Sequence, residues 1–456
     1  MSNGAQDPNA IQPEDLEEIQ GIVLRGYTFE FVRHFVLTIE DAGAFKRFLG
    51  SLVPGGPSAG PLTVTSAEIW TEKPDYTLAI GLSFAGIQAL GVPATFGNQF
   101  QYQAFKQGAV ARSPIVFDTG ASAPANWVPC LAPSSAAAAH AVLTLYAKDA
   151  ETLEARSETL RGMFGQGGAA RALSFGATDY FDGRALPDGM VHFGYADGIS
   201  QPNVMGVPRP PDKQQPVPAY EVVLRNTPEA PYPFPTPDDE VFAKNSSFGA
   251  FRILEQDVYG FETYLENSLV DKELLAAKFC GRWRNGNPLE LSPDAPADPL
   301  PPDQLTEFDY FGDPEGLRCP IGSHTRRANP RDAESFPSSK PDHRIVRRAM
   351  PYGSAWDPSQ GKDDISRGLV GYFIGASLEN QFEFIMQRWI NGQNFALNFS
   401  EPQGNDPVLG ANDTGASEFE YPPNGKVSGF EEFVTTRGGL YCMLPSLPSL
   451  AWMASR

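Results

Sequence analysis

The chain has few of the residues that most often carry chemistry in enzymes. Its 456 residues include only five histidines and four cysteines. The cysteines are far apart in the sequence and form no CxxC pair: Cys130, Cys280, Cys319 and Cys442. This scatter excludes a local zinc site and covalent cofactor attachment of the CxxCH kind, and it fits a reducing cytoplasm.

Positive charge is also scarce. Lys and Arg number 35 against 55 Asp and Glu, which gives a formal net charge of −20. Nucleic-acid binding and binding to an anionic membrane surface both need clustered basic residues, so we expect neither partner. No run of about 18 apolar residues occurs, and the N-terminus shows neither a secretion signal nor a twin-arginine motif. We therefore expect a cytoplasmic protein.

Several common catalytic motifs are missing from the sequence. There is no GxSxG elbow, no GxxxxGK[ST] loop, no HExxH and no GxGxxG after a strand. No pair of acids can be singled out as a glycosidase dyad. Serine hydrolases of the elbow type, P-loop enzymes, HExxH peptidases and dinucleotide-binding enzymes are thus not indicated.

A strand followed by a capped helix appears twice in the sequence. In "VLTIEDAGAFKRFL" the acid Asp41 precedes apolar residues four, seven and eight positions later, and Asp257 in "FRILEQDVYGFETYL" has the same offsets. Such an Asp caps the helix N-terminus, and the apolar residues form one buried stripe. Residues 140–160 and 370–390 show weaker forms of the same strand–helix pattern. The pattern predicts an internal duplication of two α+β halves, each an antiparallel sheet with helices on one face.

Proline-rich segments separate these halves. The stretch 201–244 is too rich in proline for regular structure and reads as a connector. We therefore predict an N-terminal domain at 1–200, a connector at 201–244 and a C-terminal domain at 245–456.

Among the histidines, His324 is the most informative, because "RCPIGSHTRRANPRD" surrounds it with Arg326, Arg327 and Arg331. A histidine beside arginines can hold a metal cofactor that carries carboxylates, since the imidazole ligates and the guanidiniums pair with the acids. It can equally be an ordinary polar residue. His34 and His140 lie on predicted strands and are expected to be packed or surface residues.

Two further segments have both a functional and an ordinary interpretation. In "HRIVRRAMPYG", Arg347 follows two β-branched residues and can point into a cofactor cavity, or it can belong to a solvated basic run. In "HFGYADGISQP", Asp197 lies between Gly194 and Gly198. The glycines favour a turn with positive φ, and the lone acid can be a turn residue or a proton carrier.

Taken together and in this order, the three segments resemble the signature set of the dye-decolorizing peroxidases. The family's GxxDG motif is matched by Gly194, Asp197 and Gly198, its proximal histidine by His324 and its distal arginine by Arg347. "LEEIQGIVLRGY" and "FEFIMQRWINGQNF" are also similar to the family, so the resemblance covers most of the chain. The length and the proline-rich insertions resemble the larger branch that includes fungal enzymes.

The resemblance implies two ferredoxin-like halves, in a dimeric α+β barrel-like fold, around a non-covalent haem b. It implies a peroxidase that reduces hydrogen peroxide through a ferryl intermediate and oxidises dyes, phenols or other organic reductants. His324 would ligate the iron, and Asp197 and Arg347 would be catalytic. Gly198, Arg331 and Leu369 would contact the cofactor. An acceptor behind His324 is also expected, with Glu401 and Asp406 as candidates.

The resemblance also raises questions that the sequence leaves open. Tyr352 and Trp389 can relay electrons from bulky dyes at the surface, or they can be core aromatics. Gly371 stands where the family has a bulkier, often aromatic, residue, so either the cavity is roomier or the correspondence is shifted by one position. An aspartate base, with an ordinary pKa of about 3.9, predicts an acidic pH optimum.

Two other functions are compatible with the sequence. The chain could be a non-enzymatic haem carrier or sensor that uses the same His324 pocket, although such a protein needs neither Asp197 nor Arg347. It could also be a binding module without haem. The sequence does not decide whether the chain forms a homo-oligomer.

Overall fold

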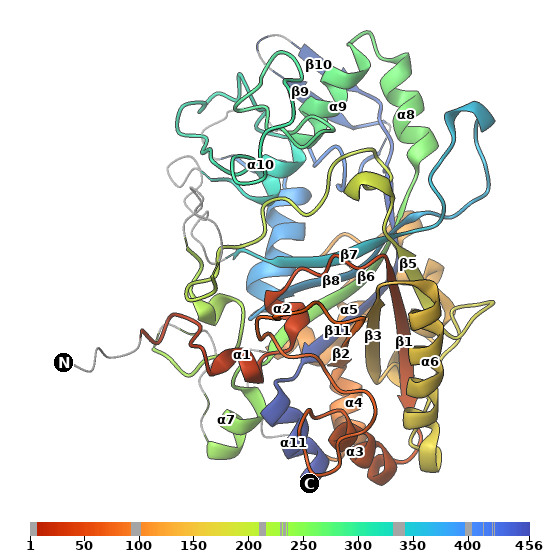
Figure 1. Cartoon of the computed structure of the whole chain (residues 1–456). Coiled ribbons are helices and arrows are strands. Elements are labelled where there is room, and N and C mark those ends of the chain that lie inside the picture. The colour runs from red at the N-terminus through yellow and green to blue at the C-terminus, as the bar shows by residue number, and fades with distance from the viewer. Residues whose placement is uncertain are drawn as a thin grey trace, which may run out of the picture.

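A nine-stranded antiparallel sheet forms the centre of the protein (Figure 1), in the order β4-β1-β3-β2-β11-β6-β8-β7, with β5 also paired to β1. Its strands are β1 (Phe31–Ile39), β2 (Tyr76–Leu82), β3 (Ala141–Ala147), β4 (Ala170–Ala172), β5 (Phe181–Arg184), β6 (Ser247–Gln256), β7 (Val346–Tyr352), β8 (Gly368–Gly375) and β11 (Val434–Leu444). A separate hairpin joins β9 (Glu418–Tyr421) and β10 (Gly425–Ser428).

This computed structural model describes residues 7–92, 102–208, 216–228, 230, 234, 236–331, 343–396, 404–413, 415–421, 423 and 425–456. Its α-helices are α1 (Asp15–Glu18), α2 (Gly21–Leu24), α3 (Ala42–Ser51), α4 (Phe84–Ala89), α5 (Gln103–Arg112), α6 (Ala150–Gly165), α7 (Pro237–Ala243), α8 (Val258–Asn267), α9 (Lys272–Cys280), α10 (His324–Ala328) and α11 (Leu447–Ser455). In Figure 1, α3, α7 and α11 gather at one end of the molecule, and α8, α9 and α10 at the other. None of the described helices is long and apolar enough to cross a bilayer.

The strand order repeats within the sheet. In the first half, the fourth, first, third and second strands lie side by side as β4-β1-β3-β2, and β11-β6-β8-β7 follow the same rule in the second half. This arrangement confirms the predicted α+β class with antiparallel sheets. Two separate sandwiches were expected, whereas the half-sheets join where Met443 of β11 pairs with Leu82 of β2. Joining them pairs two edge strands whose backbone groups would otherwise lack partners.

Both predicted helix caps are present. The Asp41 carboxylate accepts a hydrogen bond from the Ala44 N–H at the start of α3 (2.6 Å), and Asp257 accepts one from the Gly260 N–H at the start of α8 (2.8 Å). The apolar stripe of α3 is buried, and so are Phe261 and Leu265 of α8. The matched offsets therefore correspond to equivalent helices.

The two weaker forms of this pattern are also strand–helix units, but they differ in helix type. Asp149 caps α6 by accepting from the Thr152 N–H at 2.7 Å. After β8, Ser377 caps the first of two consecutive π-helical segments, η12 (Leu378–Glu383) and η13 (Ile385–Ile390). Their inner faces pack over the sheet and contribute four apolar residues to a large cavity: Phe382, Ile385, Met386 and Ile390.

The connector is tied to the N-terminal segment where the structure describes it. Arg225 forms an ion pair with Asp15 of α1 at 2.7 Å, and the side chain of Asn245, just after the connector, also donates to Asp15. The division into 1–200, 201–244 and 245–456 stays a prediction. All four cysteines are buried free thiols. His34 of β1 is buried, and His140 accepts from the Ile39 N–H at 2.9 Å, so both are packed or structural as expected.

Candidate active site

The loop that carries Asp197 is a tight turn held from several sides. Gly194 and Gly198 have φ values of 77° and 76°, as the turn interpretation predicted. The Tyr195 hydroxyl donates to the Ala276 carbonyl at 2.7 Å, which ties the loop to α9. The Asp197 N–H donates to the Gly189 carbonyl at 3.0 Å, whereas its side chain is exposed and lines the large cavity. The turn therefore presents the carboxylate to the cavity.

Arg347 lies on β7 beside the same loop. Gln201 binds the Arg347 backbone on both sides, accepting from its N–H (3.1 Å) and donating to its carbonyl (3.2 Å). The Arg347 guanidinium donates to the Ile199 carbonyl at 2.6 Å. Burial lowers the pKa of Arg347, while the nearby Asp197 carboxylate opposes that change. The acid and the guanidinium thus lie close enough to interact, on elements that hydrogen bonds hold together.

His324 begins α10, and a buried acid holds its ring. Nδ1 lies 2.8 Å from Oδ2 of Asp406, which is fully buried. The other carboxylate oxygen accepts from the Val408 and Leu409 N–H groups at 2.8 and 2.9 Å. Burial alone would raise the pKa of Asp406, but His324, the Leu409 amide and the charge of Arg327 outweigh it, so the pKa lies below its ordinary value. Of the two acids considered for this position, Asp406 occupies it, and Glu401 lies outside the described residues.

A cavity of about 630 Å³ brings these residues together. Six of the residues singled out in the sequence line it: Asp197, Gly198, His324, Arg331, Arg347 and Leu369. Its other walls are largely apolar and come from β6, β8, η12, η13 and the segment after Asp406. Segments that are more than a hundred residues apart in the sequence therefore line one cavity.

Of the three arginines near His324 in the sequence, only Arg331 lines the cavity. It donates to the Thr306 carbonyl and to the Ser200 hydroxyl, both at 2.9 Å. Arg326 and Arg327, for which pairing with cofactor carboxylates was one of two interpretations, are fully buried and do not line the cavity. Arg326 pairs with Asp313, and Arg327 donates to four backbone carbonyls. Short-range spacing could not separate these environments, because neighbouring residues on a helix face different directions.

The wall at Gly371 lacks a side chain for a steric reason. Gly371 lines the cavity between its strand partners Arg252 and Ala349. A Cβ atom there would lie 2.0 Å from the Arg348 carbonyl oxygen and 2.5 Å from the Ala349 Cα. The bulkier residue expected at this position cannot be accommodated by this backbone.

Tyr352 and Trp389 are both buried and do not line the large cavity. The Tyr352 ring packs against Phe181, with 4.9 Å between centroids, and its carbonyl accepts from His192. The Trp389 carbonyl accepts from Arg327. Their role as electron relays stays a prediction.

The sequence reasoning gave no role to four other arginines of the cavity wall: Arg252, Arg282, Arg344 and Arg348. A signal for Arg252 was present, because it is a charge within the apolar strand "FGAFRIL". A charge in such a strand needs an anionic partner or a cavity, which is the argument that singled out Arg347.

The fold and the site define a haem peroxidase, and the chain belongs to the dye-decolorizing peroxidase family. A family model described as the DyP dimeric alpha+beta barrel domain matches residues 18–171. Peroxidase 2 of Mycetinis scorodonius is 28% identical, over 96% of this chain and 87% of that protein. The structure of an ancestral D-type dye decolorizing peroxidase is 30% identical with a TM-score of 0.81, over 96% of this chain and 98% of that chain. A dye-decolorizing peroxidase in complex with 2,6-dimethoxyphenol is 27% identical with a TM-score of 0.83, over 98% of this chain and 100% of that one.

Proposed function

We propose that this enzyme uses a non-covalent haem b to reduce hydrogen peroxide and to oxidise dyes, phenols or other organic reductants, with an acidic pH optimum. The observation that carries the proposal is that His324, Asp197 and Arg347 line one cavity. A haem carrier would need the histidine alone. The phenol bound to the solved relative supports phenols as one class of reductant.

The cavity residues fit a haem. Its volume of about 630 Å³ lies within the usual range for cofactor sites. Because Asp406 accepts at Nδ1 of His324, the proton is held on that nitrogen and the lone pair of Nε2 is left to ligate a metal. Arg331 and Arg344 are the cavity arginines that would face the haem carboxylates, and Gly198 and Leu369 would contact the cofactor. When bound, the haem supplies a redox-active iron that takes two oxidising equivalents from peroxide and passes them on singly.

Asp197 would carry the proton. Its backbone is fixed by the turn, and its carboxylate is exposed to the cavity. A carboxylate so placed can accept a proton from one oxygen of hydrogen peroxide and deliver it to the other, which then leaves as water.

Arg347 would stabilise charge. Negative charge develops on the departing peroxide oxygen as the O–O bond breaks, and a fixed guanidinium lowers the energy of that state. The two hydrogen bonds from Gln201 and the contact with the Ile199 carbonyl hold Arg347 in place beforehand.

Stopped-flow mixing with peroxide, followed at the Soret band, tests the role of Asp197. Asp197→Asn is expected to slow the reaction about 100-fold or more. The matched control Asp188→Asn changes an acid in the neighbouring turn, outside the cavity lining, and is expected to react at the wild-type rate. An undiminished rate in Asp197→Asn would remove its role as proton carrier.

Two further measurements test the remaining assignments. We expect His324→Ala to be purified without haem, and normal haem retention would refute the ligand assignment. We expect an acidic pH optimum, with activity that falls as the pH rises from about 5 to about 8. The reason is that an aspartate, unlike a histidine, remains available as a base in mildly acidic solution. An increase over that range would mean that Asp197 is not the operative base.

Bulky dyes require a route for electrons that bypasses the cavity. We propose Tyr352 and Trp389 as electron-relay residues on such routes, since both are aromatic residues packed against other aromatic rings. Tyr352→Phe and Trp389→Phe should lower turnover of bulky dyes and leave turnover of small phenols unchanged. Equal losses for both substrates would indicate packing roles instead.

A further inference from the structure

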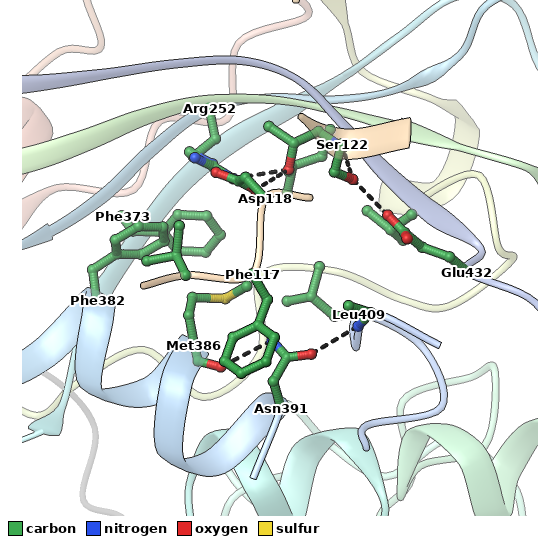
Figure 2. A pocket seen from close by; sticks show the side chains of 15 residues that line it. Phe117, Asp118, Ser122, Arg252, Phe373, Phe382, Met386, Asn391, Leu409 and Glu432 are labelled. Carbon is green, nitrogen blue, oxygen red and sulfur yellow. Dashed lines mark hydrogen bonds and ion pairs between the residues drawn. The ribbon is translucent and has the colours of Figure 1, made fainter. Parts of the chain in front are cut away.

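A second, smaller cavity shares part of its lining with the large one. Its volume is about 20 Å³, and Figure 2 shows the side chains that line it. Seven residues line both cavities, among them Arg252, Phe373, Phe382, Met386 and Leu409. Only a layer one side chain thick therefore separates the small cavity from the space proposed for the haem.

A buried ion pair forms one wall of the small cavity. Nη2 of Arg252 donates to Oδ1 of Asp118 (2.5 Å) and to the Thr436 hydroxyl (2.8 Å), and that hydroxyl donates to the same carboxylate oxygen (2.8 Å). Arg252 is 2% exposed and Asp118 4%. Among the described residues, neither Nη1 of Arg252 nor Oδ2 of Asp118 has a hydrogen-bond partner. Two side chains of this wall thus each carry an unused hydrogen-bonding atom, a donor on Arg252 and an acceptor on Asp118.

These two atoms indicate what kind of molecule the cavity would take. Leaving a buried donor or acceptor unsatisfied costs roughly 1–3 kcal/mol, so a small molecule that both donates and accepts hydrogen bonds is favoured there. A water-sized molecule needs about 10–15 Å³, and the cavity offers that space. Water and hydrogen peroxide share this size and hydrogen-bonding chemistry.

The opposite wall reaches the surface at Phe117. Its side chain lies beside Met386 and Asn391 in Figure 2, and the residue is 37% exposed. Its φ of 62° lies in the left-handed region, which bulky residues rarely adopt. Backbone strain of this kind is often retained where a residue has a functional task.

We propose that the small cavity is an inlet through which hydrogen peroxide passes to the haem cavity. Arg252 and Asp118 hold one molecule on the way, and Phe117 closes the outer end. The inference rests on the proposed function, because only a peroxide-consuming site gives the passage a purpose. It assigns a role to a charge pair that the proposed chemistry at Asp197 and Arg347 does not use.

Entry kinetics of cyanide into the holoenzyme test the inlet, since cyanide binding is followed at the Soret band without turnover. Phe117→Gly removes the ring and suits the left-handed backbone, and it should raise the association rate constant on the order of tenfold. Ala411→Leu adds bulk to the lining of the inlet and should lower that constant by a similar factor. In both variants the dissociation rate constant should change by the same factor, so that Kd stays unchanged.

Matched controls carry the same kinds of change outside the inlet. Phe311→Ala removes an exposed ring, and Ala416→Leu adds the same bulk as Ala411→Leu at an exposed position five residues further on. Cyanide should associate with both control variants at the wild-type rate. Peroxide association should follow the cyanide pattern in all four variants.

The outcomes separate the inlet from the proposed function. Unchanged rates in Phe117→Gly and Ala411→Leu, with a normal Soret shift and Kd, would overturn the inlet and leave haem ligation standing, as expected if the cavity held only a fixed water. A changed Kd would also overturn it, because the variants would then act on the haem site itself. Absence of any Soret response in the wild type would refute the proposed function, and the inlet with it.

Discussion

At the scale of single residues, the contact between His324 and Asp406 sets the properties of the candidate ligand. The carboxylate accepts on both oxygens, from the imidazole on one side and from two backbone amides on the other. An amide side chain cannot accept on both of its atoms, so asparagine would lose one set of contacts.

Asp406→Asn should therefore raise the midpoint potential of the haem iron. Without the carboxylate the proximal imidazole becomes a poorer electron donor, and the ferric state loses stabilisation. A potentiometric titration is expected to show an upward shift of tens of millivolts. Asp413→Asn, in which the changed acid accepts from the exposed Gly415 N–H, serves as the control and should leave the potential unchanged.

How far the sequence could specify the site differs from residue to residue. Asp197, His324 and Arg347 lie in short motifs whose order is recognisable, and all three line the cavity. Asp406 could be named only as one of two candidates, because 82 residues separate it from His324. The pair of Arg252 and Asp118 spans 134 residues, and no local pattern connects them.

At the scale of elements, Gly371 allows β7 and β8 to approach closely. The Arg348 carbonyl occupies the position of a side chain on Gly371, so the absent Cβ is a condition for the strand pairing. The sequence predicted four strand–helix units, because alternation and Asp caps are local signals. It could not predict the junction of β2 with β11, because Leu82 and Met443 are distant in the chain.

Gly371→Ala should destabilise the protein by about 1–3 kcal/mol, since the added methyl must push β7 and β8 apart.

Gly162→Ala is the control, in which the added methyl meets no other atom. Gly162 is exposed within α6 and has open space around its Cβ position, so alanine should stabilise the helix by roughly 0.5–1 kcal/mol. Urea unfolding of both variants measures the difference, and a loss of stability in Gly162→Ala of the same size would contradict the steric explanation.

At the scale of the whole molecule, a buried histidine links stability to pH. His34 lies in the core beside Phe251, and its Nδ1 lies 3.0 Å from the Thr144 hydroxyl. Burial lowers the pKa of His34 to about 3. In the unfolded chain a histidine titrates near 6.5, so between these values the unfolded state binds a proton that the native state does not.

The free energy of unfolding should therefore fall as the pH falls below about 6.5, by up to roughly 1.4 kcal/mol per pH unit from this group. His34→Gln keeps a hydrogen-bonding side chain without the titration, and its stability should depend less steeply on pH over this window. Urea unfolding at several pH values makes the comparison. Equal slopes for both proteins would exclude His34 as the source.

The double hydrogen bond between Gln201 and the backbone of Arg347 has a consequence for motion. Two groups on independent loops would drift apart with every thermal displacement of either loop. Here Gln201, four residues after Asp197, hydrogen-bonds to the backbone of Arg347 in β7. The Arg347 guanidinium in turn donates to the Ile199 carbonyl of the same segment. Displacements of the two are therefore correlated, and the spacing between proton carrier and charge stabiliser can persist while the pair moves as one body.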